Sequence, residues 1–272
     1  MPRVNYAAPS SVDEAVKVLA GASGLAKVLS GGTDLLVQLR SGRLKPELIV
    51  DTKRIPGLIG IREEGDFFIV GAATPGAMLS DHHALEHAWP GIVEGADLIG
   101  STQIQGRASL AGNLCNASPA ADSVPAVIAA RTTVVIAGPG GKREALAESI
   151  CTGPGRTSLA KGEFIVEFKI PKPKPHQCDA YLRFIPRTEM DIAVVGCGVN
   201  VTLDAETISY QTYQLTDGSV WMLPIYNYSG VVNNADGSSY TGTWSTIAVD
   251  PTYIQVSTSS SGGINPGGPM LY

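Results

Sequence analysis

The stretch KVLSGGTDLLVQLRSG, residues 27–42, limits the possible folds of this chain more than any other. Its first residues are typical of a buried strand, and residues 33–42 are typical of a short helix that ends at Gly42. Gly31 and Gly32 separate the two elements. Glycine has no Cβ atom, so this junction is either a tight turn or a place where backbone N–H groups reach an anion such as a pyrophosphate. Both interpretations remain open at this point.

A second stretch of small residues, SLAGNLCNASPAAD at 109–122, contains the polar residues Ser109, Asn113 and Asp122. Small residues let a ligand come close to the backbone, and a carboxylate such as that of Asp122 suits ribose or ribityl hydroxyls. An ordinary loop explains either stretch when it is taken alone. Together the two glycine-bearing loops predict a site for one long, polyhydroxylated ligand that carries a diphosphate.

The rest of the pattern mixes helices and strands without the regular βαβ spacing of a doubly wound nucleotide-binding fold. Ser11 and Glu14 predict a capping box that opens a helix, and Gly21 ends it. Residues 75–100 and 122–130 also have helical patterns. Apolar runs bounded by turn residues predict strands in six segments, residues 47–52, 66–72, 132–138, 163–171, 180–186 and 191–204. We therefore predict an α+β fold.

The composition changes sharply near Asp204. All 20 Lys and Arg, all four His and all four Cys lie in residues 1–205, and seven of the nine Tyr follow them. Residues 205–256 are strand-like and rich in Tyr, Thr and Val, with Asp-Gly pairs at 217–218 and 236–237 that predict hairpin turns. The ending STSSSGGINPGG, residues 257–268, is typical of a flexible tail. These differences predict a domain boundary near Asp204.

Several other kinds of site are disfavoured by the sequence. The segment GPGGKRE, residues 138–144, has Arg143 where a phosphate-binding loop needs Ser or Thr, so we interpret it as a hairpin. The four cysteines form no CxxC pair, which indicates scattered buried thiols and no metal site. His82, His83 and His87 lack the spacing of a zinc motif and favour a surface helix. A nucleophile elbow is absent.

Charge and hydropathy also limit the partners and the compartment. The net charge is −5, and the chain has no long basic run, so nucleic acid is not an expected partner. No segment reaches the roughly 18 apolar residues of a membrane span, and the N-terminus lacks the apolar core of a signal peptide. A cytoplasmic location is the resulting expectation.

Five segments in order then resemble one protein family. They are LSGGTDLLVQLRSGRLKPELIVDTKRIPGL, GAATPGAML, IGSTQIQGRASLAGNLCNASPAADSVPAVIAA, GPGRTSLAKGEFIVEFKIP and PRTEMDIAVVG. Over roughly residues 3–204 the chain resembles the FAD-binding medium subunits of molybdenum hydroxylases, a group that includes those of carbon monoxide dehydrogenase and xanthine dehydrogenase. The resemblance implies the vanillyl-alcohol-oxidase-type (PCMH-like) FAD fold. It implies FAD-binding subdomains at 1–55 and 56–175, the start of a C-terminal subdomain at 176–204, and an atypical β-rich tail at 205–272.

The resemblance also implies a function and a set of residues. Electrons would pass from a molybdopterin large subunit and an iron–sulfur small subunit through FAD to an external acceptor, so this chain would contain no catalytic residue for substrate hydroxylation and no metal ligand. Arg183 matches a cation near the flavin, for which a plain surface charge is the alternative. The implied cofactor-binding residues are Val28, Leu29, Ser30, Gly31, Gly32, Thr33, Asp34, Leu35, Ile99, Ser109, Gly112, Asn113, Asp122, Ile165 and Arg183.

The chain departs from its relatives at two places. Ala111-Gly112 stands where many of them have Gly-Gly, which narrows the room for backbone approach. The larger departure is the tail, which replaces the C-terminal subdomain that helps cover the flavin ring in the family. A rival hypothesis follows from the tail: the chain is a non-catalytic remnant or fusion of an FAD-binding domain that acts as a binding or structural module.

Overall fold

The computed structural model describes residues 4–187, 191–214, 220–234 and 238–247. Two compact units divide the chain: Met1–Asp204 with Gly230–Gly242, and Ala205–Ser229 with Thr243–Tyr272. The two Asp-Gly turns and the Ser/Gly/Pro ending predicted from the sequence lie outside the described residues. The four-part division predicted from the sequence stays a prediction.

The first sheet is parallel, with the strand order β1-β3-β2. Its strands are β1 (Asn5–Ala7), β2 (Ala26–Leu29) and β3 (Leu48–Asp51), and two helices, α1 (Val12–Ala20) and α2 (Leu35–Arg40), connect them. The strand, the glycine pair and the helix predicted from residues 27–42 are therefore confirmed as β2, a turn and α2.

The predicted start of α1 is also confirmed, with one difference. The Ser11 hydroxyl accepts a hydrogen bond from the Glu14 N–H at 3.2 Å. The Glu14 carboxylate accepts from the Ser10 N–H at 2.8 Å, one residue earlier than a standard capping box would place it. The first bond satisfies an N–H group of the first helical turn, which has no partner within the helix, and the second satisfies the N–H group of Ser10, which precedes the helix.

The second sheet is antiparallel and has the strand order β4-β5-β10-β6-β7. Gly138 pairs with Gly141 at the end of the β6–β7 ladder, so GPGGKRE is a hairpin, as predicted. The strands of this sheet are β4 (Ile61–Glu64), β5 (Phe67–Gly71), β6 (Thr133–Gly138), β7 (Gly141–Leu146) and β10 (Phe164–Pro171).

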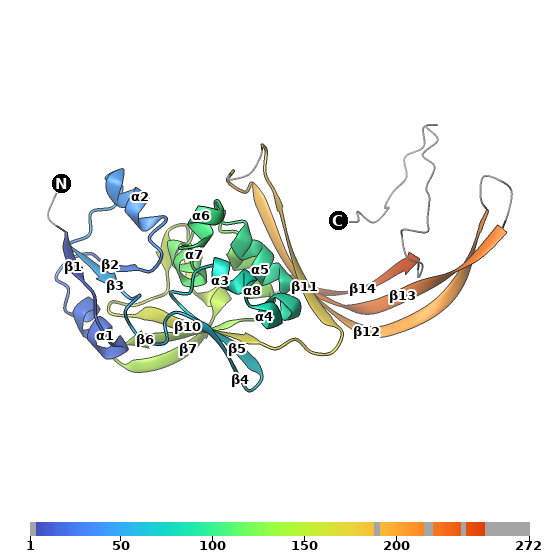
Figure 1. The fold of residues 1–272 in the computed structure, drawn as a ribbon, viewed down its shortest axis with the longest axis horizontal. Coiled ribbons are helices and arrows are strands. Elements are labelled where there is room, and N and C mark those ends of the chain that lie inside the picture. The colour runs from blue at the N-terminus through green and yellow to red at the C-terminus, as the bar shows by residue number, and fades with distance from the viewer. Residues whose placement is uncertain (1–3, 188–190, 215–219, 235–237, 248–272) are drawn as a thin grey trace. The chain divides into compact units, whose positions relative to one another are not determined.

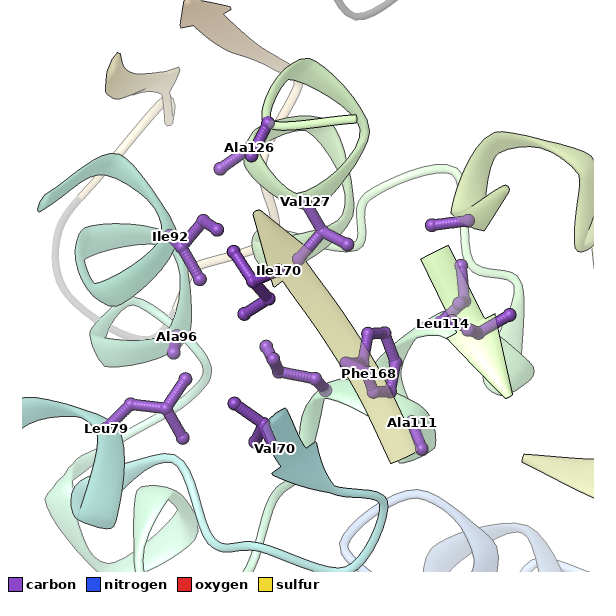
Figure 2. Close-up of a cluster of buried hydrophobic side chains, with 14 of the residues drawn as sticks. Val70, Leu79, Ile92, Ala96, Ala111, Leu114, Ala126, Val127, Phe168 and Ile170 are labelled. Atoms are coloured by element: carbon purple, nitrogen blue, oxygen red, sulfur yellow. The ribbon is translucent and has the colours of Figure 1, made fainter. Parts of the chain in front are cut away.

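Helices cover one face of this antiparallel sheet (Figure 1). They are α3 (Ala77–Ser80), α4 (His83–Ala88), α5 (Pro90–Asp97), α6 (Thr102–Gln105), α7 (Leu110–Asn116) and α8 (Ser123–Ala129). Apolar side chains of β5 and β10 meet those of α3, α5, α7 and α8 in one buried cluster. Figure 2 shows these side chains pointing toward one another: Val70, Leu79, Ile92, Ala96, Ala111, Leu114, Ala126, Val127, Phe168 and Ile170.

The other face of the same sheet packs on α1 and the parallel sheet. Val135 and Val166 point to this side and form a second core with Ala15, Leu19 and Val50. β2 lies at an edge of its sheet and is partly buried along its whole length, so one of its edges is not paired with another strand. This edge borders the site described below.

A third sheet has the order β11-β12-β13-β14. Its strands are β11 (Gln177–Phe184), β12 (Val195–Gln214), β13 (Val220–Asn234) and β14 (Ser239–Ile247), and a fourth sheet pairs β8 (Cys151–Gly153) with β9 (Arg156–Thr157), after the 3₁₀ helix Ala147–Ser149. The strand-like character predicted after residue 205 is thus confirmed for the described part, and the α+β class holds for the chain.

β11 is joined to α5 by a buried carboxylate. Asp179 accepts a hydrogen bond from the Gly91 N–H at 2.9 Å, in the first turn of α5. Desolvation by burial raises the pKa of Asp179 to about 6, and the nearby Glu94 carboxylate adds to the increase. The other carboxylate oxygen of Asp179 is buried without a hydrogen-bond partner among the described residues.

The prediction of four buried thiols is wrong for two of them. Cys178 and Cys197 are exposed, and Cys115 and Cys151 are partly buried. Side chains alternate across a strand, and Cys178 lies on the face of β11 opposite to the buried Asp179. That face of β11 is exposed, which explains the position of this thiol.

Candidate functional site

The turn after β2 touches a distant part of the chain through Gly31. A Cβ atom at Gly31 would lie 1.7 Å from the backbone oxygen of Arg107 and 3.1 Å from the Ala108 nitrogen. The missing side chain of Gly31 therefore lets two backbones meet, residues 30–34 on one side and residues 107–109 on the other. Gly32 serves the turn itself, because its φ of 80° is in the left-handed region that favours glycine.

This turn leaves a series of backbone donors unpaired. Within the described part of the chain, no backbone N–H from Gly31 to Leu35 donates to a protein acceptor; the first that does is the Leu36 N–H, which donates to the Gly32 carbonyl at 3.0 Å. Consecutive N–H groups at the start of a helix form a concave, electropositive surface for an anion. The turn therefore has the donors that the sequence predicted, although Gly31 is required for contact with Arg107.

The second segment differs from the predicted loop, because residues 110–116 form helix α7. The Ser109 hydroxyl accepts a hydrogen bond from the Gly112 N–H at 3.1 Å and so caps the helix. Gly112 and Asn113 thus lie in the first helical turn. The prediction of a loop is wrong here because the capping hydroxyl and the buried face of α7 offset the low helix propensity of these two residues.

Side-chain hydrogen bonds join the two segments. The hydroxyls of Ser30 and Ser109 are 2.9 Å apart. The Asn113 side-chain oxygen accepts from the Ser123 hydroxyl at 2.8 Å, which fixes the orientation of the Asn113 amide. The residues predicted from two separate sequence stretches are therefore brought to one place.

Two adjoining cavities lie at this junction. The smaller, which we call the cradle, has a volume of about 50 Å³ and is lined by Ser30, Gly31, Gly32, Thr33, Asp34, Ile99, Ala108, Ser109, Gly112 and Asn113. The larger, which we call the chamber, has a volume of about 390 Å³. Its walls come from residues 24–28, Ser30, Ala111, Gly112, Cys115, Thr157 and residues 159–165, together with Leu19, Thr52 and Ala72. Ser30 and Gly112 line both cavities, so the two adjoin.

A network of polar side chains holds the turn that follows β2. The Lys53 ammonium donates to the Ser30 carbonyl at 2.9 Å and to the Asp51 carboxylate at 2.8 Å. The Tyr6 hydroxyl donates to the other oxygen of Asp51 at 2.7 Å. These bonds hold the end of β2 in place.

Asp122 and Arg183 form a buried pair beyond α7. The Arg183 guanidinium donates to the Asp122 carboxylate at 3.2 Å and to the Leu98 carbonyl at 3.0 Å. The Arg183 side chain is only 9% exposed, which excludes the surface-charge interpretation. The Tyr181 hydroxyl donates to the same Asp122 oxygen at 3.1 Å. Burial and the Asp122 charge raise the pKa of Tyr181, so its phenol stays a neutral donor.

Most of the predicted residues therefore meet at the two cavities, and four do not line either of them. Val28 and Ile165 line the chamber, and the cradle holds the predicted residues from Ser30 to Asp34, with Ile99, Ser109 and Asn113. Leu29, Leu35, Asp122 and Arg183 line neither cavity.

The chamber also contains residues that the sequence did not predict, among them Lys27, Cys115, Leu159, Lys161 and Phe164. The connection between β9 and β10, residues 158–163, forms part of the wall of the chamber, and no local pattern in these residues indicates this role. Burial raises the pKa of the Cys115 thiol to about 12, so this group is neutral at physiological pH.

The described residues offer neither a metal site nor a membrane span. Among them, no group of three or more His, Cys, Asp or Glu could hold a metal ion. Within the same residues, none of the helices has the length and apolar character needed to cross a bilayer.

The arrangement fits an elongated ligand that has an apolar end and an anionic centre. The chamber has mostly small or apolar walls, and the cradle provides unpaired N–H groups and the hydroxyls of Ser30, Thr33 and Ser109. An adenosine moiety needs the first environment, and a diphosphate needs the second.

Comparisons with known proteins agree with this geometry. A family model described as the FAD binding domain in molybdopterin dehydrogenase matches residues 2–173. The chain is 33% identical over 216 residues to the carbon monoxide dehydrogenase medium chain of Hydrogenophaga pseudoflava, a match that covers 79% of this chain and 75% of that one. It is 32% identical over 203 residues to the xanthine dehydrogenase FAD-binding subunit of Escherichia coli O157:H7, covering 74% and 69% of the two chains.

A solved structure of carbon monoxide dehydrogenase from Hydrogenophaga pseudoflava, which lacks the Mo-pyranopterin moiety of its cofactor, has the same fold with a TM-score of 0.69 and 30% identity. The match covers 88% of this chain and 77% of that chain. The sequence match to the Hydrogenophaga pseudoflava medium chain covers 79% of this chain and the structural match covers 88%, so the structural match includes more of the chain.

Proposed function

The chain belongs to the family of FAD-binding domains of molybdopterin dehydrogenases, and from this premise we propose that it passes electrons from the iron–sulfur clusters of a partner subunit, through FAD, to an external acceptor. As an FAD-binding subunit of this class it is part of an oxidoreductase. The transfer of electrons from the iron–sulfur clusters to FAD, and from FAD to an external acceptor, is the part that we propose.

The single observation that carries the proposal is the meeting of two separate segments at the cradle. Five consecutive residues of the first segment, Gly31 to Leu35, have backbone N–H groups without a protein acceptor in the described part of the chain. The second segment adds the Ser109 hydroxyl, which is held 2.9 Å from that of Ser30. An FAD diphosphate is the group in the expected cofactor that such donors would bind.

We assign the residues on the two sides of the cradle to the two ends of the cofactor. The chamber, with Val28 and Ile165, would take the adenosine end. Asp122 and Arg183 lie beyond α7 and line neither cavity, so we assign them to the flavin end. When bound there, FAD supplies a ring that accepts electrons and releases them again.

Arg183 would act on that ring through its charge. A buried cation stabilises the negative charge of a reduced flavin, and Asp122 moderates the effect by neutralising part of the guanidinium charge. The Leu98 carbonyl and the Asp122 carboxylate fix the direction of the guanidinium before any cofactor binds. Neither residue needs to transfer a proton in this role.

The partners follow from the relatives. Those proteins are named as a medium chain or as an FAD-binding subunit, so a small iron–sulfur subunit and a large molybdopterin subunit are the proposed partners here. A cytoplasmic location remains a prediction.

Titration of the purified chain with FAD tests the binding half. We expect a yellow protein with a flavin absorbance band that remains after gel filtration. A Gly31→Ala variant should bind less FAD, because its Cβ atom would overlap the Arg107 carbonyl. A colourless wild-type chain that cannot be reconstituted would contradict the proposal and favour the non-catalytic module.

The electron route needs a second measurement. A reduced [2Fe–2S] protein, added to the FAD-loaded chain without oxygen, should bleach the flavin band, and an added quinone or nicotinamide acceptor should restore it. A yellow chain that no reduced iron–sulfur protein bleaches would retain FAD binding and overturn the electron-transfer half.

A further inference from the structure

No cationic side chain lines the cradle. An FAD diphosphate carries two negative charges, yet no Lys or Arg is among the residues that line the cradle, and the Asp34 carboxylate is. Backbone N–H groups supply partial positive charge only. Cationic side chains that reach the diphosphate from a neighbouring surface would add charge-assisted hydrogen bonds to those of the backbone.

Two lysines of the chamber have no counter-charge. Lys27 and Lys161 both line the chamber, and within the described residues neither ammonium forms an ion pair or a hydrogen bond with the protein. Lys53, by contrast, is held by Asp51 and the Ser30 carbonyl.

The neighbours of Lys27 cannot neutralise it. Ala26 and Val28 pack toward α1, so Lys27 lies on the alternate face of β2, half-buried and close enough to Cys115 to lower the pKa of that thiol slightly. Burial keeps the Cys115 thiol neutral, with a pKa of about 12. A half-buried ammonium without a partner anion is unfavourable, and a bound anion would relieve this cost.

The acidic neighbour of Lys161 is already engaged. Glu163 accepts hydrogen bonds from the Arg143 guanidinium at 2.7 and 2.8 Å and from the Ala160 N–H at 2.8 Å. These bonds fix the wall that carries Lys161, while Lys161 itself remains exposed at the chamber. Among the described residues the Lys161 ammonium therefore has no ion pair that would compete with a ligand.

We propose that Lys27 and Lys161 bind the diphosphate of the cofactor from the chamber side and supply the charge that the cradle lacks. The inference rests on the proposed function, because it takes FAD as the ligand. It adds two binding residues from outside the glycine-bearing segments, one from β2 and one from the connection between β9 and β10. The chamber that these lysines line adjoins the cradle, because both cavities are lined by Ser30 and Gly112.

Two ligands that differ only in the diphosphate test the idea. ADP carries this group and adenosine does not, so their dissociation constants separate a charge contact from a change in chamber shape. For Lys27→Met and Lys161→Met we expect the ADP and FAD dissociation constants each to rise by about tenfold, the usual effect of losing one charge-assisted hydrogen bond. The adenosine constant should change less than about twofold, and the ADP constant should depend less on salt.

The matched control removes one positive charge elsewhere. Lys142 is exposed on β7 and faces another part of the surface, so Lys142→Met should leave both constants unchanged. Lys27→Arg should restore most of the ADP affinity, because it returns the positive charge.

The outcomes separate this inference from the proposed function. A wild-type chain that binds neither FAD nor ADP contradicts both. A wild-type chain that binds both ligands, with lysine variants that bind them equally well, overturns only the role of the lysines. An equal loss of ADP and adenosine affinity also overturns it, because chamber shape would then explain the result.

Discussion

Gly31 is the residue at which the two segments of the cradle come closest. Its missing side chain faces the Arg107 carbonyl, so the contact belongs to the protein and exists before any ligand binds. The contact between Gly31 and Arg107 also helps to orient the unpaired N–H groups of residues 32–35. The absence of a Cβ atom at Gly31 therefore matters both for the packing of the fold and for the proposed binding site.

Replacing Gly31 by Ala should affect both stability and binding. A Cβ atom 1.7 Å from a carbonyl oxygen forces the segments apart, so we expect the free energy of unfolding to fall by about 1–3 kcal/mol. Urea denaturation and FAD titration measure the two effects. The matched control is Gly140→Ala in the β6–β7 hairpin, where an added Cβ meets nothing within 4 Å. Similar losses in both variants would contradict the explanation.

Asp179 gives the chain a pH dependence of defined sign. Burial raises its pKa from 3.8 to about 6, so the folded chain holds this proton more tightly than the unfolded chain does. The contribution of Asp179 to stability is therefore most favourable below pH 4 and becomes less favourable as the pH rises to about 6. Two pKa units correspond to about 3 kcal/mol as an upper limit.

The variant Asp179→Asn isolates this contribution, because the amide oxygen can still accept from the Gly91 N–H. The stability of this variant relative to the wild type should increase between pH 4 and pH 7, as measured by urea unfolding at each pH. A difference that stays constant with pH would show that Asp179 does not titrate in this range.

At the scale of elements, two short helices that begin with serine have different roles. Ser11 caps α1 far from the cradle, whereas Ser109 caps α7 and also contacts Ser30. Each Ser→Ala change should lower the free energy of unfolding by about 1 kcal/mol. Only Ser109→Ala should also weaken FAD binding, because it removes a hydroxyl that lines the cradle. Equal FAD affinities in the two variants would remove Ser109 from the site.

The same elements show what the sequence could predict. α1, β2 and the β6–β7 hairpin have their patterns within a few consecutive residues, and each was predictable. α7 was not, because Gly112 and Asn113 disfavour a helix and the burial of Leu110 and Leu114 is set by distant strands. The chamber was hidden for a similar reason: its walls come from three segments that only the fold brings together.

The site itself divides in the same way. The glycine pair and the small polar residues indicated a diphosphate ligand, and the family resemblance extended this to specific positions. Lys27 and Lys161 could not be singled out from the sequence, since an unpaired lysine and a surface lysine look alike there. Only the structure shows that these two lysines are unpaired, because it shows which acidic side chains already form ion pairs with other cations. Glu163, for example, pairs with Arg143.

At the scale of the whole molecule, the cavities of the proposed cofactor site lie in one unit. Every residue of the cradle and the chamber is in Met1–Asp204. FAD at one hundred times its dissociation constant should stabilise this unit by about 2.7 kcal/mol. For a unit of this size, that corresponds to a rise in melting temperature of roughly 5–10 °C.

Tryptophan fluorescence can assign that transition. Trp89 is buried in the unit that contains the site, and Trp221 and Trp244 belong to the other unit. A Trp221→Phe, Trp244→Phe double variant reports on Trp89 alone and should show the full FAD-dependent shift. A variant that retains only Trp221 and Trp244 should show little. Equal shifts in both would contradict a site confined to one unit.

The contact between Gly31 and Arg107 has a consequence for how such proteins change over generations. A lineage that stopped using the cofactor would still lose stability on replacing Gly31, because two backbones meet there. Purifying selection for folding alone would retain the glycine long after the ligand had gone. Selection for folding would not retain Lys27 and Lys161 in the same way. We expect a lineage that no longer binds the cofactor to replace these lysines before it replaces Gly31.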